Sequence, residues 1–169
     1  GETWSKIFWF ERGVPAKVAR IWHTYGPNMD IENDPRVFSS FVNDVVNDND
    51  IIIKGNGEAT RTFCYVTDAI EAFFRILFDG NNGEAYNVCN SQQCYSIKEL
   101  ANLIVELVPE KKLKVTFQKR ENNENYIENK TYGQIIPRND KLKKLGWKCR
   151  VNCKDGFDRI IRMKKEEKI

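Results

Sequence analysis

The sequence predicts a mixed α/β (α+β) fold in which short strands and helices alternate along the chain. Three observations support this. Apolar side chains at residues 37–46 recur at helical spacing, residues 51–53 are three consecutive isoleucines typical of a strand, and residues 69–78 return to a helical run. Such alternation is typical of domains in which helices pack on a sheet. The strands are few and short, however, so a complete doubly wound sheet does not fit this chain.

The first part of the chain is an apolar segment followed by strand signals. Residues 1–13 are rich in tryptophan and phenylalanine, but Gly13 and Pro15 follow, and a segment this short does not form a stable helix on its own. It has the character of the end of a longer element. Strands are expected at residues 17–22, 51–53 and 62–66, with a turn at 25–27 and a polar loop at 28–35.

The next helix, residues 69–78, is apolar on most of its sides. Thr67 or Asp68 is a suitable N-cap for it. A helix that is apolar nearly all round is normally buried, so we expect Phe73, Phe74 and Phe78 to belong to the core.

The C-terminal part alternates in the same way. Ser96 and Glu99 match a capping box, which predicts a helix start, and Pro109 ends that helix. The remaining predictions are strands at 85–89 and 113–117, a polar loop at 119–134, and helices at 141–145 and 154–163.

Composition excludes several classes of protein. The chain has 169 residues with a formal net charge of +3, and basic residues are interleaved with acidic ones, so no broad basic face for nucleic acid is expected. The five cysteines form no C-x-x-C pair and the single histidine is remote from them, so no metal site is expected. We interpret the cysteines as free thiols in a reducing cytoplasm.

The sequence shows no targeting signal. The first residues lack the pattern of a signal peptide, and no apolar run approaches the ~20 residues that span a bilayer. We therefore expect a soluble cytoplasmic protein without a membrane partner.

Two features near the middle of the chain could serve a ligand. Gly55-x-Gly57 lacks the third glycine and the following helix of a dinucleotide loop, so a β-turn is the better interpretation. Arg61 follows this turn and opens an aromatic strand. Its guanidinium could hold a phosphate with two hydrogen bonds, or it could be a surface arginine paired with a carboxylate. Composition and spacing leave both alternatives open.

His23 is the only histidine and ends a predicted strand, where ligands bind in α/β folds. It could act as a general base, but no serine or cysteine is obviously paired with it, and a hydrogen-bonded structural role is the alternative. Tyr25 and Tyr65 are interpreted as packing residues.

The order of several segments resembles a known family. Residues 20–27 (RIWHTYGP), 34–41 (DPRVFSSF) and 53–69 (IKGNGEATRTFCYVTDA) are similar to successive motifs of extended short-chain dehydrogenase/reductases that act on nucleotide sugars. Residues 96–101 (SIKELA) and 145–147 (LGW) continue the series. The chain therefore resembles members of the NAD-dependent epimerase/dehydratase family, in particular UDP-glucuronate decarboxylases and dTDP-glucose 4,6-dehydratases.

This resemblance implies that two parts of the family's fold bind different molecules. In the family an N-terminal Rossmann domain holds NAD, and a C-terminal lobe binds the nucleotide diphosphate of the sugar. The resemblance implies that Arg61 contacts the diphosphate and that Ile52 and Lys54 flank the base. The other implied substrate-binding residues are His23, Thr24, Tyr25, Val37, Phe38, Phe41 and Arg120.

The chain departs from the family pattern in ways that limit its activity. It contains no Gly-rich NAD fingerprint, and the tyrosine of the family's Tyr-x-x-x-Lys pair falls before Gly1. We therefore expect no catalytic residue and no bound NAD in this chain alone. His23 stands where the family usually has asparagine.

Together these observations predict the C-terminal substrate-binding lobe of an NAD-dependent nucleotide-sugar epimerase, dehydratase or decarboxylase, binding a UDP- or dTDP-sugar. The expected organisation is a truncated or rearranged segment (1–15), the sugar-nucleotide lobe (16–163) and a charged tail (164–169). The alternative is a non-catalytic binding module that keeps the lobe fold. Candidate partners are a chain carrying the Rossmann half and a second copy of this chain.

Overall fold

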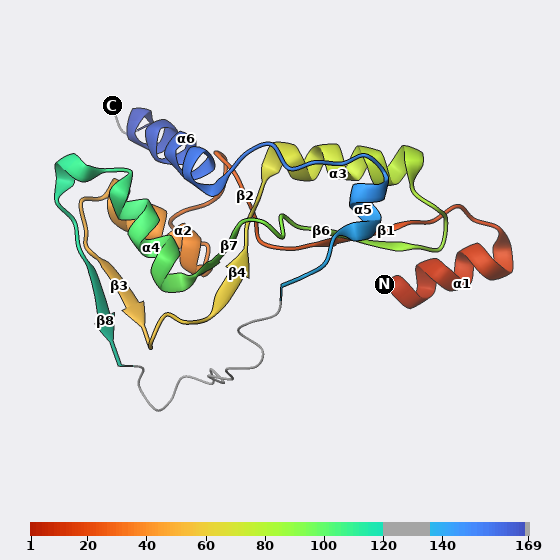
Figure 1. The fold of residues 1–169 in the computed structure, drawn as a ribbon, viewed down its shortest axis with the longest axis horizontal. Coiled ribbons are helices and arrows are strands. Elements are labelled where there is room, and N and C mark those ends of the chain that lie inside the picture. Colours follow the sequence, from red (N-terminus) through yellow and green to blue (C-terminus); the bar gives the residue numbers. More distant parts are fainter. Residues whose placement is uncertain (120–135, 168–169) are drawn as a thin grey trace. The chain divides into compact units, whose positions relative to one another are not determined.

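The computed structural model describes residues 1–119 and 136–167 (Figure 1). Helices and strands alternate through the described residues, as the sequence predicts. In chain order they are α1 (Glu2–Arg12), β1 (Val18–Ile21), β2 (Thr24–Tyr25), α2 (Val37–Val46), β3 (Ile51–Lys54), β4 (Thr60–Thr62), β5 (Cys64–Tyr65), α3 (Val66–Asp79), β6 (Ala85–Val88), β7 (Cys94–Ser96), α4 (Ile97–Glu106), the 3₁₀ turn η1 (Pro109–Lys111), β8 (Val115–Gln118), α5 (Asp140–Lys144) and α6 (Cys153–Glu166).

The chain is divided into two compact units, each assembled from three separate segments. Unit 1 comprises Gly1–Tyr25, Thr62–Gln93 and Pro137–Val151. Unit 2 comprises Gly26–Arg61, Cys94–Ile136 and Asn152–Ile169. Among the described residues, no helix has the length and apolar character needed to cross a membrane.

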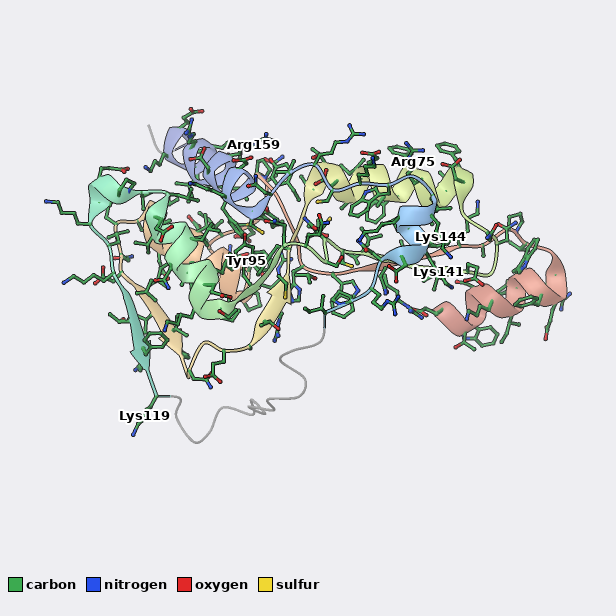
Figure 2. All side chains as sticks on the ribbon, viewed as in Figure 1. Arg75, Tyr95, Lys119, Lys141, Lys144 and Arg159 are labelled. Atoms are coloured by element: carbon green, nitrogen blue, oxygen red, sulfur yellow. The ribbon has the colours of Figure 1, made fainter. Side chains whose placement is uncertain are left out.

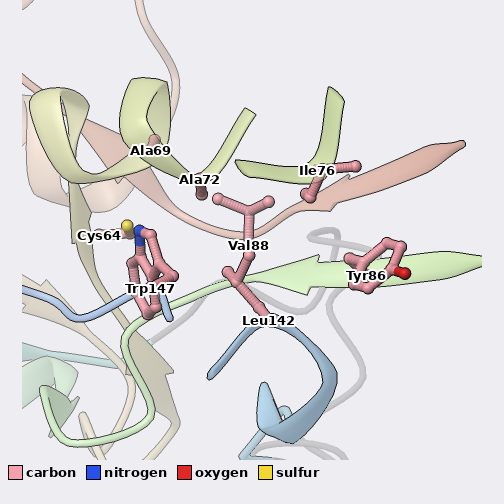
Figure 3. Close-up of a cluster of buried hydrophobic side chains, with 8 residues drawn as sticks. All are labelled: Cys64, Ala69, Ala72, Ile76, Tyr86, Val88, Leu142 and Trp147. Carbon is pink, nitrogen blue, oxygen red and sulfur yellow. The ribbon is translucent and has the colours of Figure 1, made fainter. Parts of the chain in front are cut away.

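Unit 1 is built on a parallel pair of strands. β1 pairs with β6 in the register Val18↔Ala85 to Ile21↔Val88. The helix α3 precedes β6 in the chain and packs against both β1 and β6. Its contact face is lined by small side chains, and a core of buried residues forms there (Figure 3): Cys64, Ala69, Ala72, Ile76, Tyr86, Val88, Leu142 and Trp147. Residues far apart in the sequence thus meet in one core.

The start of α3 differs from the prediction. Neither Thr67 nor Asp68 is the N-cap, because the helix begins at Val66 with Tyr65 as its cap. Asp68 is buried and serves a tertiary contact instead. Its Oδ2 accepts hydrogen bonds from the backbone N–H groups of Arg150 (3.1 Å) and Val151 (3.0 Å). The Asp68 carboxylate therefore binds a distant segment of the chain and does not cap the helix.

The outer face of α3 is also different from the prediction. The expectation that Phe73, Phe74 and Phe78 lie in the core is wrong, since all three are exposed, Phe74 and Phe78 to 55% and 73%. Only Asp68, Ala69, Ala72 and Ile76 of this helix are buried. An apolar pattern around a helix shows that most faces avoid charge, but it does not show which faces the chain itself covers.

The N-terminal segment forms a helix in spite of its shortness. The αL conformation of Gly13 (φ 65°) lets the last turn of α1 close with two hydrogen bonds: the N–H of Gly13 donates to the carbonyl of Trp9, and the N–H of Val14 donates to the carbonyl of Phe8. Glu2 forms an ion pair with Arg20 of β1 at 2.6 Å. The helix contains no fully buried residue, so these contacts at its ends add to its local stability.

Unit 2 packs three helices with a second parallel strand pair. α2, α4 and α6 contact one another, and α2 and α4 contact β3, which pairs with β8 (Figure 1). The capping box that opens α4 is confirmed: Ser96 accepts from the N–H of Glu99, and Glu99 accepts from the N–H of Ser96. At the other end of the chain, α6 continues to Glu166, three residues beyond the predicted helix and into the segment expected to be a charged tail.

Candidate functional site

Arg61 lies in β4, at the end of a unit 2 segment. Its side chain is half-buried, and its Nη1 donates a hydrogen bond of 2.7 Å to the carbonyl oxygen of Thr60. Among the residues that the structure describes, no carboxylate forms an ion pair with it. A guanidinium carries five N–H donors, so a single intrachain bond leaves most of them for an anion.

The glycine turn before Arg61 is a packing turn. Gly55 and Gly57 have positive φ angles of 91° and 70°, as the β-turn interpretation requires. The carbonyl of Gly57 accepts from the N–H of Lys98 at 3.0 Å, and the carbonyl of Ala59 accepts from the N–H of Ile97 at 3.0 Å. A side chain at Gly57 would come within 3.2 Å of the Cβ of Lys98. The carbonyl groups of the turn therefore fix β4 against the start of α4 by accepting from its first two amides.

The residues of α2 to which the resemblance assigns substrate binding differ in their exposure to solvent. Phe38 and Phe41 are buried in the interior of unit 2, with exposures of 1% and 2%, and Val37 is half-buried. Arg36 lies just before them, with its guanidinium 4.7 Å from the centre of the Phe38 ring. The motifs of the sequence do not single out Arg36. A basic residue two positions before an aromatic candidate is the signal that could have found it.

Asp34 holds the start of α2 in place. Its carboxylate accepts from the Nε of Arg36 at 2.7 Å and from the Oγ of Ser39 at 2.8 Å. These hydrogen bonds lower the pKa of Asp34 from 3.8 to about 2, and the bond from the Arg36 side chain has the largest effect. The side chain is only 11% exposed, so solvent screens this cluster weakly.

This depressed pKa predicts an acid-dependent loss of stability. Because the carboxylate is favoured in the folded state, Asp34 stabilises the protein above its unfolded pKa near 4, and that contribution disappears as the pH falls from 4 towards 2. At about 1.4 kcal/mol for each pKa unit, the free energy of unfolding should drop by about 2 kcal/mol. Urea titrations of the chain and of Asp34→Asn across this pH range test it. An unchanged pH dependence in the variant would show that Asp34 is not responsible.

Ile52 and Lys54 lie on the exposed face of β3. The neighbouring Ile51 and Ile53 are buried, so side chains alternate between core and solvent along the strand. The backbone of β3 pairs with β8 in parallel, with Ile52 opposite Thr116 and Lys54 opposite Gln118. These two implied residues are therefore accessible from solvent in unit 2.

His23, Thr24 and Tyr25 belong to unit 1. β2 pairs in parallel with β5, and the carbonyl of His23 accepts from the N–H of Cys64 at 3.0 Å. The His23 ring lies 5.9 Å from the Phe63 ring. Tyr25 is buried with its ring edge-on to Phe63, 6.3 Å between centroids, which agrees with a packing role. The hydroxyl of Thr24 donates to the carbonyl oxygen of Trp22 at 3.0 Å.

The implied residues therefore fall into two groups. Unit 2 holds Arg61, Val37, Phe38, Phe41, Ile52 and Lys54, and unit 1 holds His23, Thr24 and Tyr25. Arg120 lies outside the described residues.

The thiols and acids of the described residues offer no obvious nucleophile or metal site. Burial raises the pKa of Cys89 to about 12, and burial also raises the pKa of Cys94. Such thiols are not thiolates near neutral pH. Among the described residues, no three His, Cys, Asp or Glu side chains converge as metal ligands would. The chemistry that this arrangement supports is binding of an anion through arginine.

Comparison with known sequences identifies similar proteins. The sequence profile of the NAD dependent epimerase/dehydratase family matches residues 1–89. The chain is 28% identical over 167 residues to a dTDP-D-glucose 4,6-dehydratase of Bos taurus. The aligned region covers 98% of this chain and 45% of that protein. It is 31% identical over 149 residues to UDP-glucuronic acid decarboxylase 3 of Arabidopsis thaliana, covering 87% of this chain and 40% of that protein. The chain thus spans less than half the length of these relatives.

Solved structures show the same fold at lower identity. A UDP-glucose 4-epimerase of Thermotoga maritima, solved with UDP-glucose, superposes with a TM-score of 0.85 at 20% identity, over 99% of this chain and 52% of that one. A dTDP-glucose 4,6-dehydratase of Bacillus anthracis, solved with NAD, gives 0.77 at 18% identity, over 99% of this chain and 50% of that one. The predicted fold class, a mixed α/β part of the extended short-chain dehydrogenase fold, is confirmed.

Proposed function

The chain belongs to the NAD dependent epimerase/dehydratase family, and from this premise we propose that it is the C-terminal, substrate-binding part of a nucleotide-sugar epimerase, dehydratase or decarboxylase. Its ligand is the nucleotide diphosphate of a UDP- or dTDP-sugar. The observation that carries the proposal is the half-buried Arg61, which has a single hydrogen bond to Thr60 and no ion pair with a carboxylate among the described residues.

The chemistry of Arg61 suits a diphosphate. A planar guanidinium donates two parallel hydrogen bonds to a phosphate, which gives both orientation and strength. Ile52 and Lys54 expose their side chains on β3 and would flank the base, and Val37 at the start of α2 belongs to the same unit. Phe38 and Phe41 are buried in the interior of the same unit.

NAD does not fit the residues of this chain. The family name and the NAD-bound relative imply the cofactor, but the one Gly-x-Gly turn before Arg61 already bonds to the first amides of α4. No G-x-G-x-x-G sequence occurs in the chain. We therefore derive no hydride-transfer step from these residues, and NAD would be held by a different polypeptide segment.

A non-catalytic binding module is the second candidate. It is favoured by the exposed aromatic side chains of α3 and α1, which suit contact with another protein. The candidate partners are a chain that carries a Rossmann half and a second copy of this chain.

The first expected result is an absence of turnover combined with specific binding. The isolated chain should not convert UDP- or dTDP-sugars when NAD is supplied, because it offers no Gly-rich turn for the cofactor. UDP, dTDP and UDP-glucuronate should nevertheless shift backbone amide signals around Arg61 and residues 37–41 in an NMR titration.

The controls separate the two candidates. Adenosine monophosphate and inorganic phosphate test whether any anion gives the same shifts. Shifts confined to Arg61 and α2 support the nucleotide-sugar lobe, silence at every amide supports the non-catalytic module, and detectable turnover would overturn the expectation of catalytic incompleteness.

A further inference from the structure

The chain contains two asparagines that are followed by glycine, Asn56-Gly57 and Asn82-Gly83. Such pairs deamidate readily, because glycine has no side chain to shield its backbone nitrogen. That nitrogen attacks the side-chain carbonyl carbon of the asparagine and forms an N–Cγ bond. The Cγ–Nδ2 bond breaks, and ammonia leaves with the proton of the glycine N–H. Water then opens the resulting succinimide at either carbonyl, which gives aspartate or isoaspartate.

The surroundings of Asn56 favour this reaction. Asn56 lies in the turn between β3 and β4, and β4 pairs with β7, the strand that carries Tyr95 (labelled in Figure 2). The side chain is exposed, so water reaches it. Its Oδ1 accepts from the N–H of Glu58 at 3.1 Å, which closes an Asx turn. This ring folds the carbonyl carbon back over the nitrogen of Gly57, and the hydrogen bond polarises the carbonyl group for attack.

The attacking nitrogen and the leaving group of this pair are both accessible to the reaction. Within residues 1–119 and 136–167, the N–H of Gly57 donates no hydrogen bond, since the turn is anchored through its carbonyl oxygens. The Nδ2 of Asn56 donates to the Oε2 of Glu58 at 3.1 Å, and both side chains are exposed. Ammonia can therefore leave directly into solvent.

The Asn82-Gly83 pair is protected by its packing in unit 1. The N–H of Gly83 donates to the carbonyl oxygen of Ala16 at 2.7 Å, so this bond must open before the nitrogen can attack. Gly83 is buried, and a Cβ added to it would lie 2.7 Å from the Cδ1 of Trp9. The Oδ1 of Asn82 is buried too and accepts no hydrogen bond from the described residues, so its carbonyl is not polarised.

We infer that Asn56 is a site of spontaneous deamidation and that Asn82 is not. Nucleotide binding plays no part in this inference, which therefore stands apart from the proposed function. Conversion of Asn56 to aspartate replaces an amide donor by a carboxylate beside that of Glu58, and the two like charges repel each other.

The isoaspartate product changes the turn more strongly. It adds one carbon to the backbone directly before Gly57, where even an added Cβ would lie 3.2 Å from the Cβ of Lys98. The two hydrogen bonds between the turn and the first amides of α4, each 3.0 Å long, must then rearrange. These bonds hold β4, the strand that contains Arg61, so deamidation alters the support of the candidate anion-binding residue.

Peptide mass spectrometry of the folded chain after prolonged incubation at body temperature tests this inference. The peptide that contains Asn56 should gain the mass expected when an NH2 group is replaced by OH, and it should take up heavy oxygen from labelled water. An isoaspartyl methyltransferase detects isoaspartate in the same peptide. Conversion of Asn82 should be at least about fivefold slower, because the hydrogen bond to Ala16 must open first.

Two controls isolate the effect of the folded structure. In urea that unfolds the chain, both asparagines lose their surroundings and should react at rates equal within about twofold. Asn56→Ser should abolish the mass change in its own peptide and leave the rate at Asn82 unaltered. Equal rates at the two positions in the folded protein, a faster reaction at Asn82, or no reaction at Asn56 while the unfolded chain reacts would each overturn the inference.

Discussion

Replacing Asp68 with alanine is expected to lower the free energy of unfolding by about 3–4 kcal/mol. The carboxylate is buried and accepts three hydrogen bonds at Oδ2, from the N–H groups of Arg150 and Val151 and from the Sγ of Cys149 at 2.9 Å. Its removal leaves two backbone donors without an acceptor. Because Trp147 donates its Nε1–H to the carbonyl of Asp68 at 2.9 Å, the same region also anchors a core tryptophan.

Two neighbouring changes isolate the contribution of the Asp68 carboxylate. Asp68→Asn keeps one acceptor oxygen in nearly the same volume and should cost about 1–2 kcal/mol. Thr67→Ala removes the other predicted N-cap, which is exposed and caps nothing, and should change stability by less than about 0.5 kcal/mol. Urea denaturation followed by circular dichroism measures all three. A loss below about 1 kcal/mol for Asp68→Ala would contradict this account of how residues 149–151 are held.

Replacing Arg61 with alanine is expected to weaken binding of UDP or dTDP by at least about 30-fold. The proposed diphosphate loses the only cation that the resemblance assigns to it within the described residues. The nucleotide affinity of Arg61→Lys should lie between those of the wild-type chain and Arg61→Ala. An ammonium keeps the charge but not the paired donors of a guanidinium. Isothermal titration calorimetry on the three proteins gives the dissociation constants directly.

Arg162→Ala is the matched control for Arg61. It removes the same charge from unit 2, on the surface of α6, where Arg162 pairs with Asp158 at 2.9 Å. Nucleotide affinity should be unchanged within about twofold. If both substitutions weaken binding equally, net charge rather than position 61 accounts for the effect. If neither does, Arg61 does not contact the diphosphate.

Local signals predicted the elements that depend on local interactions. The Ser96–Glu99 capping box and the apolar stripe of α2 need only neighbours within one or two turns, and both form as predicted. The strands β2 and β7 escaped notice because two or three residues are too few for an alternating pattern. The start of α3 was misplaced because Asp68 bonds to residues some eighty positions later in the chain.

The candidate site shows a similar limit. Spacing identified Gly55-x-Gly57 as a turn and Arg61 as a notable cation, and the structure gives the positive φ angles that the turn needs. The pairing state of Arg61 depends on which acids lie nearby, and no local pattern encodes that. The roles of Phe38 and Phe41 rest on resemblance alone, since an apolar helical stripe is the same whether it supports a pocket or fills a core.

The interleaving of the two units has a consequence for synthesis on the ribosome. The chain changes unit after Tyr25, Arg61, Gln93, Ile136 and Val151. The core of unit 1 waits for Trp147, and that of unit 2 waits for Phe157 and Ile160 of α6. Neither core can close while residues 147–161 are still inside the exit tunnel. Growing chains therefore keep apolar surface exposed until these residues emerge, which makes early binding by chaperones an expected step in the synthesis of this protein.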